Sequence, residues 1–370
     1  MSPPVAKDTA IVIPARNEEA RIGACLSALS AQASARVSVI LVVNNTTDRT
    51  IDIARAVAIR SGLDMTVVDL KLSPSEGVGT ARKFGCDHAL RTMPDLRYLL
   101  TTDADCITAP NWVARNLAHL QIVDVVCGKV DLIADEAEIL DGMNRKLAER
   151  ESVYRGLVQD IYATYSTSST DISGTHGEAA GASLSFGKPA YLAVGGFAPI
   201  VCGEDRRIVR SFRRAGYEVR HASDVTVRAS CRLSGRATGG MSDALRARFN
   251  GTDYLIDDCL PPADWLVRQA VRKALGPWPP YVPAHLRLNV QDLPRHIKLL
   301  RNFNNSERLI SASNALAAAL PSFEFGMPTP DKRSAIIPND PDLRARTATD
   351  QCMPITTETN GSGKPTSKGA

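Results

Sequence analysis

The sequence predicts an α/β protein with a mostly parallel, twisted sheet, helices on both faces, and a C-terminal helical segment. Short apolar runs alternate with amphipathic segments through the first third of the 370 residues, as in strands joined by helical crossovers. The run 37–43 is continuous and rich in β-branched residues, which is typical of a strand buried on both faces. Two carboxylates follow directly on another predicted strand, and the carboxyl edge is where open α/β sheets bind ligands.

The elements are expected in a regular order. Apolar runs predict strands over 10–13, 37–43, 65–70, 97–102, 124–130 and 182–186. Helical spacing predicts a helix starting near residue 22, with Asn17 as its cap, and further helices over 50–59, 80–90, 113–120 and 135–165. Residues 244–320 are expected to be mainly helical, with breaks at the proline pairs 261–262 and 279–280.

Composition indicates three parts and excludes some functions. We expect an α/β domain over 1–230, a helical accessory segment over 231–325, and a disordered tail over 326–370, where apolar residues become rare. The net charge of +4 is too small to indicate nucleic-acid binding. Eight scattered cysteines without a C-x-x-C pair favour a reduced, cytoplasmic protein. Neither a signal peptide nor an apolar run of membrane length is expected, and peripheral contact with the inner face of the membrane stays open.

Asp103 and Asp105 are the most informative pair of residues, because they stand where the strand 97–102 ends. Two acids one residue apart can share a divalent cation, which prefers hard oxygen ligands and also accepts phosphate oxygens. A nucleotide diphosphate is the ligand that fits such a site. The alternative is an Asp-rich turn that caps the next helix, and the motif by itself does not choose between the two.

Five further segments lead to a specific resemblance. They are IVIPARNEE at 11–19, LVVNNTTDRT at 41–50, GVGTARKFG at 77–85, the Asp-Ala-Asp motif at 103–105, and the ordered block GGF, GED and RAGY at 195–197, 203–205 and 214–217. Over about residues 9–228 the chain resembles a family 2 glycosyltransferase of the GT-A fold, a nucleotide-diphospho-sugar transferase. The resemblance implies Mg²⁺ or Mn²⁺ as the cofactor and a nucleotide-diphosphate sugar as the donor.

The resemblance also implies roles for four acids. Asp105 is expected to hold the metal, with Asp103 helping to orient the metal or the ribose, so that charge on the leaving phosphate is neutralised. Asp205 is expected to be the general base that takes the proton of the acceptor hydroxyl, and Glu204 to position the acceptor or the helix. A carboxylate at a helix N-terminus can instead be a simple cap, and this alternative stays open for Asp205.

The nucleotide-sugar site is predicted from the first two strand ends. Pro14, Arg16, Asn17 and Glu18 form the turn after the first strand. Asn44 ends the second strand, where the family often has an acid that contacts the base; an amide both donates and accepts hydrogen bonds, which leaves uridine specificity in doubt.

Several candidate ligand-binding residues lie further along the chain. Asp48 is expected either to contact the nucleotide base or to cap the next helix. Arg82 is expected either to contact the base or the phosphates, or to be a solvated residue on a helix. Arg232 and Arg236 suggest a diphosphate clamp or a basic surface turn. Gly181 and Ala182 end a Ser-, Thr- and Gly-rich loop predicted to be a mobile lid.

Three more polar residues have open roles. His176 and Glu178 of the predicted lid are candidates for sugar binding, or are exposed loop residues. His221 is a late metal ligand or, the better-supported alternative, a histidine at a strand edge.

The predicted function is inverting transfer of a single sugar to a hydroxyl acceptor, either a small molecule or lipid-linked. The Q-x-x-R-W element of the processive family members is absent, which argues against polymer synthesis. One alternative is a non-catalytic nucleotide-binding scaffold. Another is a sugar-nucleotide nucleotidyltransferase, which needs a glycine-rich Arg-Lys loop directly after the first strand, and this chain has none there.

Overall fold

The computed structural model describes residues 6–32, 34, 36–73, 75–235, 240–251 and 253–319. These residues belong to one compact unit of the chain, 1–325. The predicted tail 326–370 and Arg236 lie outside the described residues, and the predicted domain boundaries remain predictions. Among the described residues, no helix is both long enough and apolar enough to cross a membrane.

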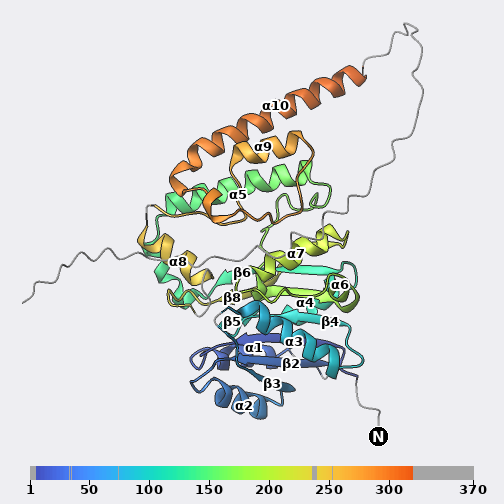
Figure 1. Ribbon diagram of the computed structural model, residues 1–370, viewed down its shortest axis with the longest axis vertical. Coiled ribbons are helices and arrows are strands. Elements are labelled where there is room, and N and C mark those ends of the chain that lie inside the picture. The colour runs from blue at the N-terminus through green and yellow to red at the C-terminus, as the bar shows by residue number, and fades with distance from the viewer. Residues whose placement is uncertain are drawn as a thin grey trace, which may run out of the picture. The chain divides into compact units, whose positions relative to one another are not determined.

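One eight-stranded sheet organises the molecule (Figure 1). Its strands lie in the order β3-β2-β1-β4-β7-β6-β8-β5. Four of its seven strand pairings are parallel, and β7 and β5 supply the three antiparallel ones. The predicted α/β fold with a mostly parallel sheet is therefore confirmed. The strand bounds are β1 Thr9–Ala15, β2 Val37–Asn44, β3 Met65–Leu70, β4 Tyr98–Thr101, β5 Cys106–Thr108, β6 Val125–Leu132, β7 Leu184–Gly187 and β8 Val219–Ala229.

Strand β5 was not predicted, because three residues are too few to show an alternating pattern. It follows directly on Asp105 and pairs antiparallel with the end of β8, where Cys106 lies opposite Ala229. This pairing brings the loop that follows β8 next to the Asp103–Asp105 motif.

Helices cover both faces of the sheet (Figure 1). Side chains of β1 alternate between two buried clusters: Ile11 and Ile13 pack with α1, α2 and α4, whereas Ala10 and Val12 pack with α3, α6 and α7. The helix bounds are α1 Ile22–Ser30, α2 Thr50–Ser61, α3 Val78–Thr92, α4 Trp112–His119, α5 Arg145–Tyr165, α6 Lys188–Ala193, α7 Glu204–Arg214, α8 Met241–Asn250, α9 Ala263–Val271 and α10 Leu293–Ala319.

A third apolar cluster forms a helical layer from α5, α9, α10 and the buried Trp278 (Figure 1). The predicted C-terminal helical segment is thus present, and α5 joins it from earlier in the chain. The single helix predicted over 135–165 is wrong. A 3-10 segment, Ala134–Gly142, precedes α5, and the Asn144 side chain caps α5 by accepting hydrogen bonds from the backbone N–H groups of Lys146 and Leu147 at 3.1 and 3.3 Å.

Candidate active site

The candidate site lies at the carboxyl edge of β1, β2 and β4, which are parallel neighbours. Their carboxyl ends bring together the loops 16–21, 45–49 and 102–105, as expected for ligand binding in this kind of sheet. The first two loops are cross-linked: the backbone N–H of Glu18 donates to Thr50 Oγ1 at 2.7 Å, and the N–H of Glu19 donates to Asp48 Oδ2 at 3.0 Å.

Asn17 and Asp48 hold this pair of loops in shape. Asn17 has a left-handed backbone (φ 53°), and its Oδ1 accepts from the N–H of Thr47 at 2.8 Å. The expectation that Asn17 caps the first helix is wrong, since Arg21 is the residue before α1. Asp48 Oδ1 accepts from the N–H of Thr50 at 3.0 Å. Slight burial raises the pKa of Asp48, but the hydrogen bonds from Thr50 and Glu19 outweigh it and lower that pKa below its usual range.

Arg82 connects the predicted metal motif with the predicted acceptor-side acids. Its guanidinium, on α3, is only 3% exposed and forms ion pairs with both Asp103 and Glu204. A solvated helix position is therefore excluded for Arg82. Burial lowers the pKa of Arg82, but the two carboxylates raise it above its ordinary value, so the guanidinium is a permanent cation. Gly181 packs directly against it, and a Cβ at position 181 would overlap the guanidinium.

Arg232 makes a second bridge, from the loop after β8. Its guanidinium binds both carboxylate oxygens of Glu18, at 2.6 and 2.5 Å, and lies 2.9 Å from Asp105 Oδ2. The hydrogen bonds to Glu18 raise the pKa of Arg232, while burial opposes them. Each acid of the Asp103–Asp105 motif is therefore paired with its own arginine.

The residues of the motif fit a hard divalent cation. Ligand atoms of Asp103, Asp105 and Cys106 lie within 4.8 Å of one another. Burial and the neighbouring charge of Asp103 together raise the pKa of Asp105 to about 6, although Arg232 opposes both. Burial raises the pKa of Cys106 well above its ordinary value, so the thiol stays protonated. Two crowded carboxylates beside a neutral thiol suit Mg²⁺ or Mn²⁺ better than a soft metal.

Asp205 and Glu204 open helix α7 but face different partners. Gly203, with φ 77°, makes the turn into the helix. Asp205 Oδ2 accepts from the N–H of Gly181 at 3.0 Å, and its Oδ1 accepts from the N–H of Arg206 at 2.7 Å. Glu204 is 1% exposed, and burial raises its pKa while Arg82 lowers it. The buried ion pair with Arg82 indicates a structural role for Glu204.

Other predicted ligand-binding residues show no polar contact that indicates a role. Pro14 is buried within β1, and Ala182 is buried in the 3-10 turn before β7. Asn44 ends β2 opposite Leu70. Arg16 is exposed and forms no ion pair with any residue that the structure describes. Nucleotide binding by these residues stays a prediction.

Several residues of the loop predicted to be a mobile lid are packed into the molecule. Its Ser169 and Ile172 are fully buried, and the His176 side chain is 7% exposed. The rings of His176 and His221 meet edge to face with centroids 5.3 Å apart. His176 is therefore not an exposed loop residue, and both histidines belong to the interior.

One group of charged residues near Asp205 was missed by sequence reasoning. Arg206 forms ion pairs with Asp257 and Asp258, which lie between α8 and α9. No spacing or motif in the sequence connects these residues, because they are more than 50 positions apart and meet only in the folded chain.

Part of the chain matches a known family. Residues 10–165 match the family described as "Glycosyl transferase family 2". The chain carries a family 2 glycosyltransferase domain. The predicted family is thereby confirmed for this segment. The matched segment contains the Asp103–Asp105 motif and ends with α5, so Asp205 and Arg232 lie beyond it. A search of curated proteins finds no match to the chain.

Solved structures that resemble the glycosyltransferase domain are distant in sequence. S. aureus TarS 1–349 with UDP-GlcNAc is 16% identical, covers 72% of this chain and 66% of its own, and has a TM-score of 0.44. The mannosyltransferase PcManGT of Pyrobaculum calidifontis with GDP-Man and Mn²⁺ is 18% identical, with coverage of 85% and 81% and a TM-score of 0.45. The glucosyl-3-phosphoglycerate synthase of Mycobacterium tuberculosis, with Mn²⁺, UDP and product, is 18% identical, with coverage of 66% and 76% and a TM-score of 0.41. The chain thus spans just under two thirds of the length of the TarS fragment.

Proposed function

We propose that this chain transfers one sugar from a nucleotide-diphosphate sugar to a hydroxyl acceptor, with inversion at the anomeric carbon. The observation that carries the proposal is the buried Arg82 bridge. It joins Asp103, at the end of β4, to Glu204, beside the candidate base Asp205, and so puts a metal motif and a base at one edge of the sheet. Donor and acceptor can therefore meet between them.

The donor side is built by Asp103, Asp105 and Arg232. The two carboxylates would hold Mg²⁺ or Mn²⁺, which supplies Lewis-acid stabilisation of the leaving diphosphate. Arg232 lies 2.9 Å from Asp105 and presents further N–H groups, which can bind phosphate oxygens in the fork geometry of a guanidinium. Glu18 orients that guanidinium through two hydrogen bonds.

The acceptor side is built by Asp205. Each of its carboxylate oxygens accepts one backbone N–H, which leaves a lone pair on each for the proton of an acceptor hydroxyl. A positioned carboxylate that takes this proton as the oxygen attacks acts as a general base. Attack from the side opposite the diphosphate, in a single displacement, inverts the anomeric configuration. The acceptor, a small molecule or a lipid-linked hydroxyl, and the cytoplasmic location are also part of this proposal.

The decisive experiment is a thermal-shift panel of UDP, GDP, dTDP, CDP and ADP, with and without Mn²⁺. A ligand that binds only the native state raises the melting temperature by mass action. We expect one nucleotide to give a Mn²⁺-dependent shift that Asp105→Ala abolishes and Asp52→Ala, an exposed acid on α2, retains. No shift with any nucleotide would overturn the proposal.

A second measurement separates binding from chemistry. Asp205→Asn should keep the nucleotide-dependent shift but lose sugar transfer, by about 10²- to 10⁴-fold, because an amide cannot take a proton. Retained sugar transfer in this variant would remove the base assignment while leaving the donor site intact. Formation of a nucleotide sugar from a nucleoside triphosphate and a sugar phosphate would instead identify a nucleotidyltransferase.

A further inference from the structure

A pair of acids between α8 and α9 binds the side chain next to the candidate base. Arg206, the third residue of α7 and the immediate neighbour of Asp205, forms ion pairs with Asp257, at 2.9 Å, and with Asp258. Its side chain is about one third exposed. These acids belong to the segment between α8 and α9, so this segment contacts the helix that carries the candidate base.

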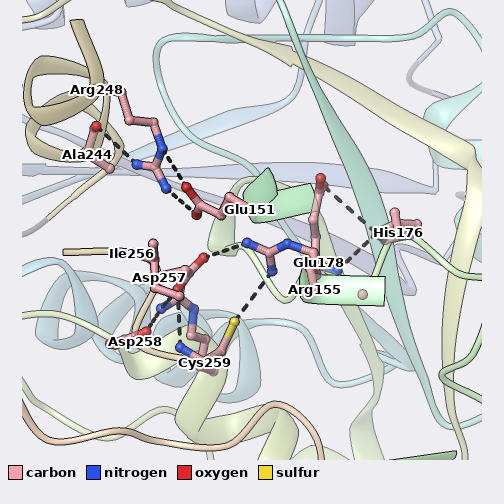
Figure 2. A network of polar contacts seen from close by, with 12 residues as sticks. Glu151, Arg155, His176, Glu178, Ala244, Arg248, Ile256, Asp257, Asp258 and Cys259 are labelled. Carbon is pink, nitrogen blue, oxygen red and sulfur yellow. Dashed lines mark hydrogen bonds and ion pairs between the residues drawn. The ribbon is translucent and has the colours of Figure 1, made fainter. Parts of the chain in front are cut away.

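The two acids are themselves held in place (Figure 2). Arg155 of α5 binds Asp257 at 3.1 Å and the thiol of Cys259 at 3.4 Å. The carbonyl of Asp258 accepts from the N–H of Val282 at 2.8 Å. Burial raises the pKa of Asp257, but Arg206 and Arg155 lower it far below its usual range, so this carboxylate remains ionised. Burial raises the pKa of Cys259 to about 11, which keeps the thiol neutral.

The arrangement has a consequence for Asp205. The charges of two arginines and two aspartates balance in one group: Arg155, Arg206, Asp257 and Asp258. Within this group, the Arg206 guanidinium pairs with the two aspartates. Asp205 is one of the charges that act on Arg206. If Asp257 and Asp258 were neutral, they would no longer attract the Arg206 guanidinium. The anion that remains near it would then be Asp205, on the same helix. A cation at a carboxylate favours its ionised form and weakens it as a base.

We propose that Asp257 and Asp258 are positioning residues for the transfer reaction, which keep the Arg206 guanidinium off the candidate base Asp205. The inference rests on the proposed function and deepens it, because it gives the helical layer a part in catalysis.

Other charged groups also face Asp205. They come from α3, as Arg82, and from α7 itself, as Glu204 and Arg210. Arg82 already has two carboxylate partners, and Arg210 donates to the carbonyl of Pro279 at 3.2 Å. Arg206 is therefore the cation whose position depends on Asp257 and Asp258.

The test uses the full chain and water as the acceptor, so that no acceptor need be known. Release of nucleoside diphosphate is followed from pH 5 to 8 with the nucleotide sugar whose base the thermal-shift panel identifies. We expect Asp258→Asn to lower the rate at pH 7.5 about three- to tenfold and to move the acid limb of the pH–rate profile to lower pH. The Mn²⁺-dependent thermal shift with the nucleotide should stay unchanged.

The double variant Arg206→Gln/Asp258→Asn decides whether the acid acts through Arg206. The double variant has no Arg206 guanidinium. Its rate and the acid limb of its pH–rate profile should therefore equal those of Arg206→Gln alone. Asp264→Asn, which breaks an exposed pair with Arg268 on α9, is the matched control and should behave as wild type.

Three outcomes would contradict the inference. They are an Asp258→Asn rate equal to wild type, a loss that the double variant does not relieve, and a parallel loss of nucleotide binding. If the wild type binds no nucleotide, the proposed function fails and this inference fails with it. If the wild type binds and releases nucleoside diphosphate while Asp258→Asn does the same, only the inference fails.

Discussion

Arg82 and Glu204 form an ion pair in the interior of the protein, although they stand 122 positions apart in the chain. The same guanidinium binds Asp103, so one buried cation pairs with a carboxylate on a loop and with a carboxylate at the start of α7. Neither carboxylate has another arginine or lysine partner among the described residues. The shape of the candidate site therefore depends on Arg82.

Arg82→Gln should destabilise the fold strongly. Removing one partner of a buried ion pair leaves uncompensated charge and costs about 3–5 kcal/mol in the free energy of unfolding. Urea titration at pH 7.5 measures this loss. Arg60→Gln, at the exposed end of α2, should change the free energy by less than about 0.5 kcal/mol. If both substitutions changed the free energy of unfolding by a similarly small amount, the Arg82 ion pairs would contribute little to stability.

Gly181→Ala should disturb the ion pairs of Arg82 with Asp103 and Glu204. A Cβ at this position overlaps the Arg82 guanidinium, and forcing a methyl group into a packed site costs about 1–3 kcal/mol. Gly156→Ala in α5 is the matched control, since its Cβ would meet open space. Alanine has the higher helix propensity, so that change should stabilise the chain slightly. Denaturant midpoints of the two variants should thus move in opposite directions.

Arg232→Gln should tighten the binding of Mn²⁺ to the nucleotide-free chain, by roughly tenfold, because a cation competes with the guanidinium for Asp105. Electron paramagnetic resonance of free Mn²⁺ measures this affinity directly. The same variant should weaken binding of the nucleoside diphosphate, if Arg232 also binds phosphate. Arg115→Gln, which breaks an exposed pair with Asp224, should change neither affinity. Weaker Mn²⁺ binding in Arg232→Gln would contradict competition.

The pair His176 and His221 predicts a loss of stability in weak acid. Burial lowers the pKa of His176 to about 4 and that of His221 to about 3. The unfolded chain takes up protons at these side chains below about pH 6.5. Their contribution to stability is therefore complete above pH 6.5 and is lost as the pH falls towards 4, at up to about 1.4 kcal/mol per pH unit for each histidine.

Urea unfolding at several pH values between 7.5 and 5 tests this expectation. His221→Gln should flatten the dependence of the free energy of unfolding on pH, whereas the exposed His285→Gln should leave its slope unchanged. Equal slopes in wild type and His221→Gln would show that the buried pair is not the source of acid sensitivity.

Much of the fold follows from local pattern. The β-branched run 37–43 and the apolar run 65–70 became β2 and β3 within one residue of their predicted ends. Helix α5 was placed too early, because apolar spacing continues through Ala134–Gly142, while the cap that starts the helix is the single residue Asn144. Strand β5 is too short to be seen in the sequence, and its pairing with β8 exists only in three dimensions.

The sequence by itself determined the order of most strands and helices, the family, and the position of Asp103 and Asp105 at a strand end. These features depend on periodicity and on motifs confined to a few neighbouring residues. Only the tertiary structure decided which arginine meets which acid: Arg82 with Asp103 and Glu204, and Arg232 with Glu18 and Asp105. The physical reason is that burial and ion pairing act between side chains that the sheet brings together, whatever their separation along the chain.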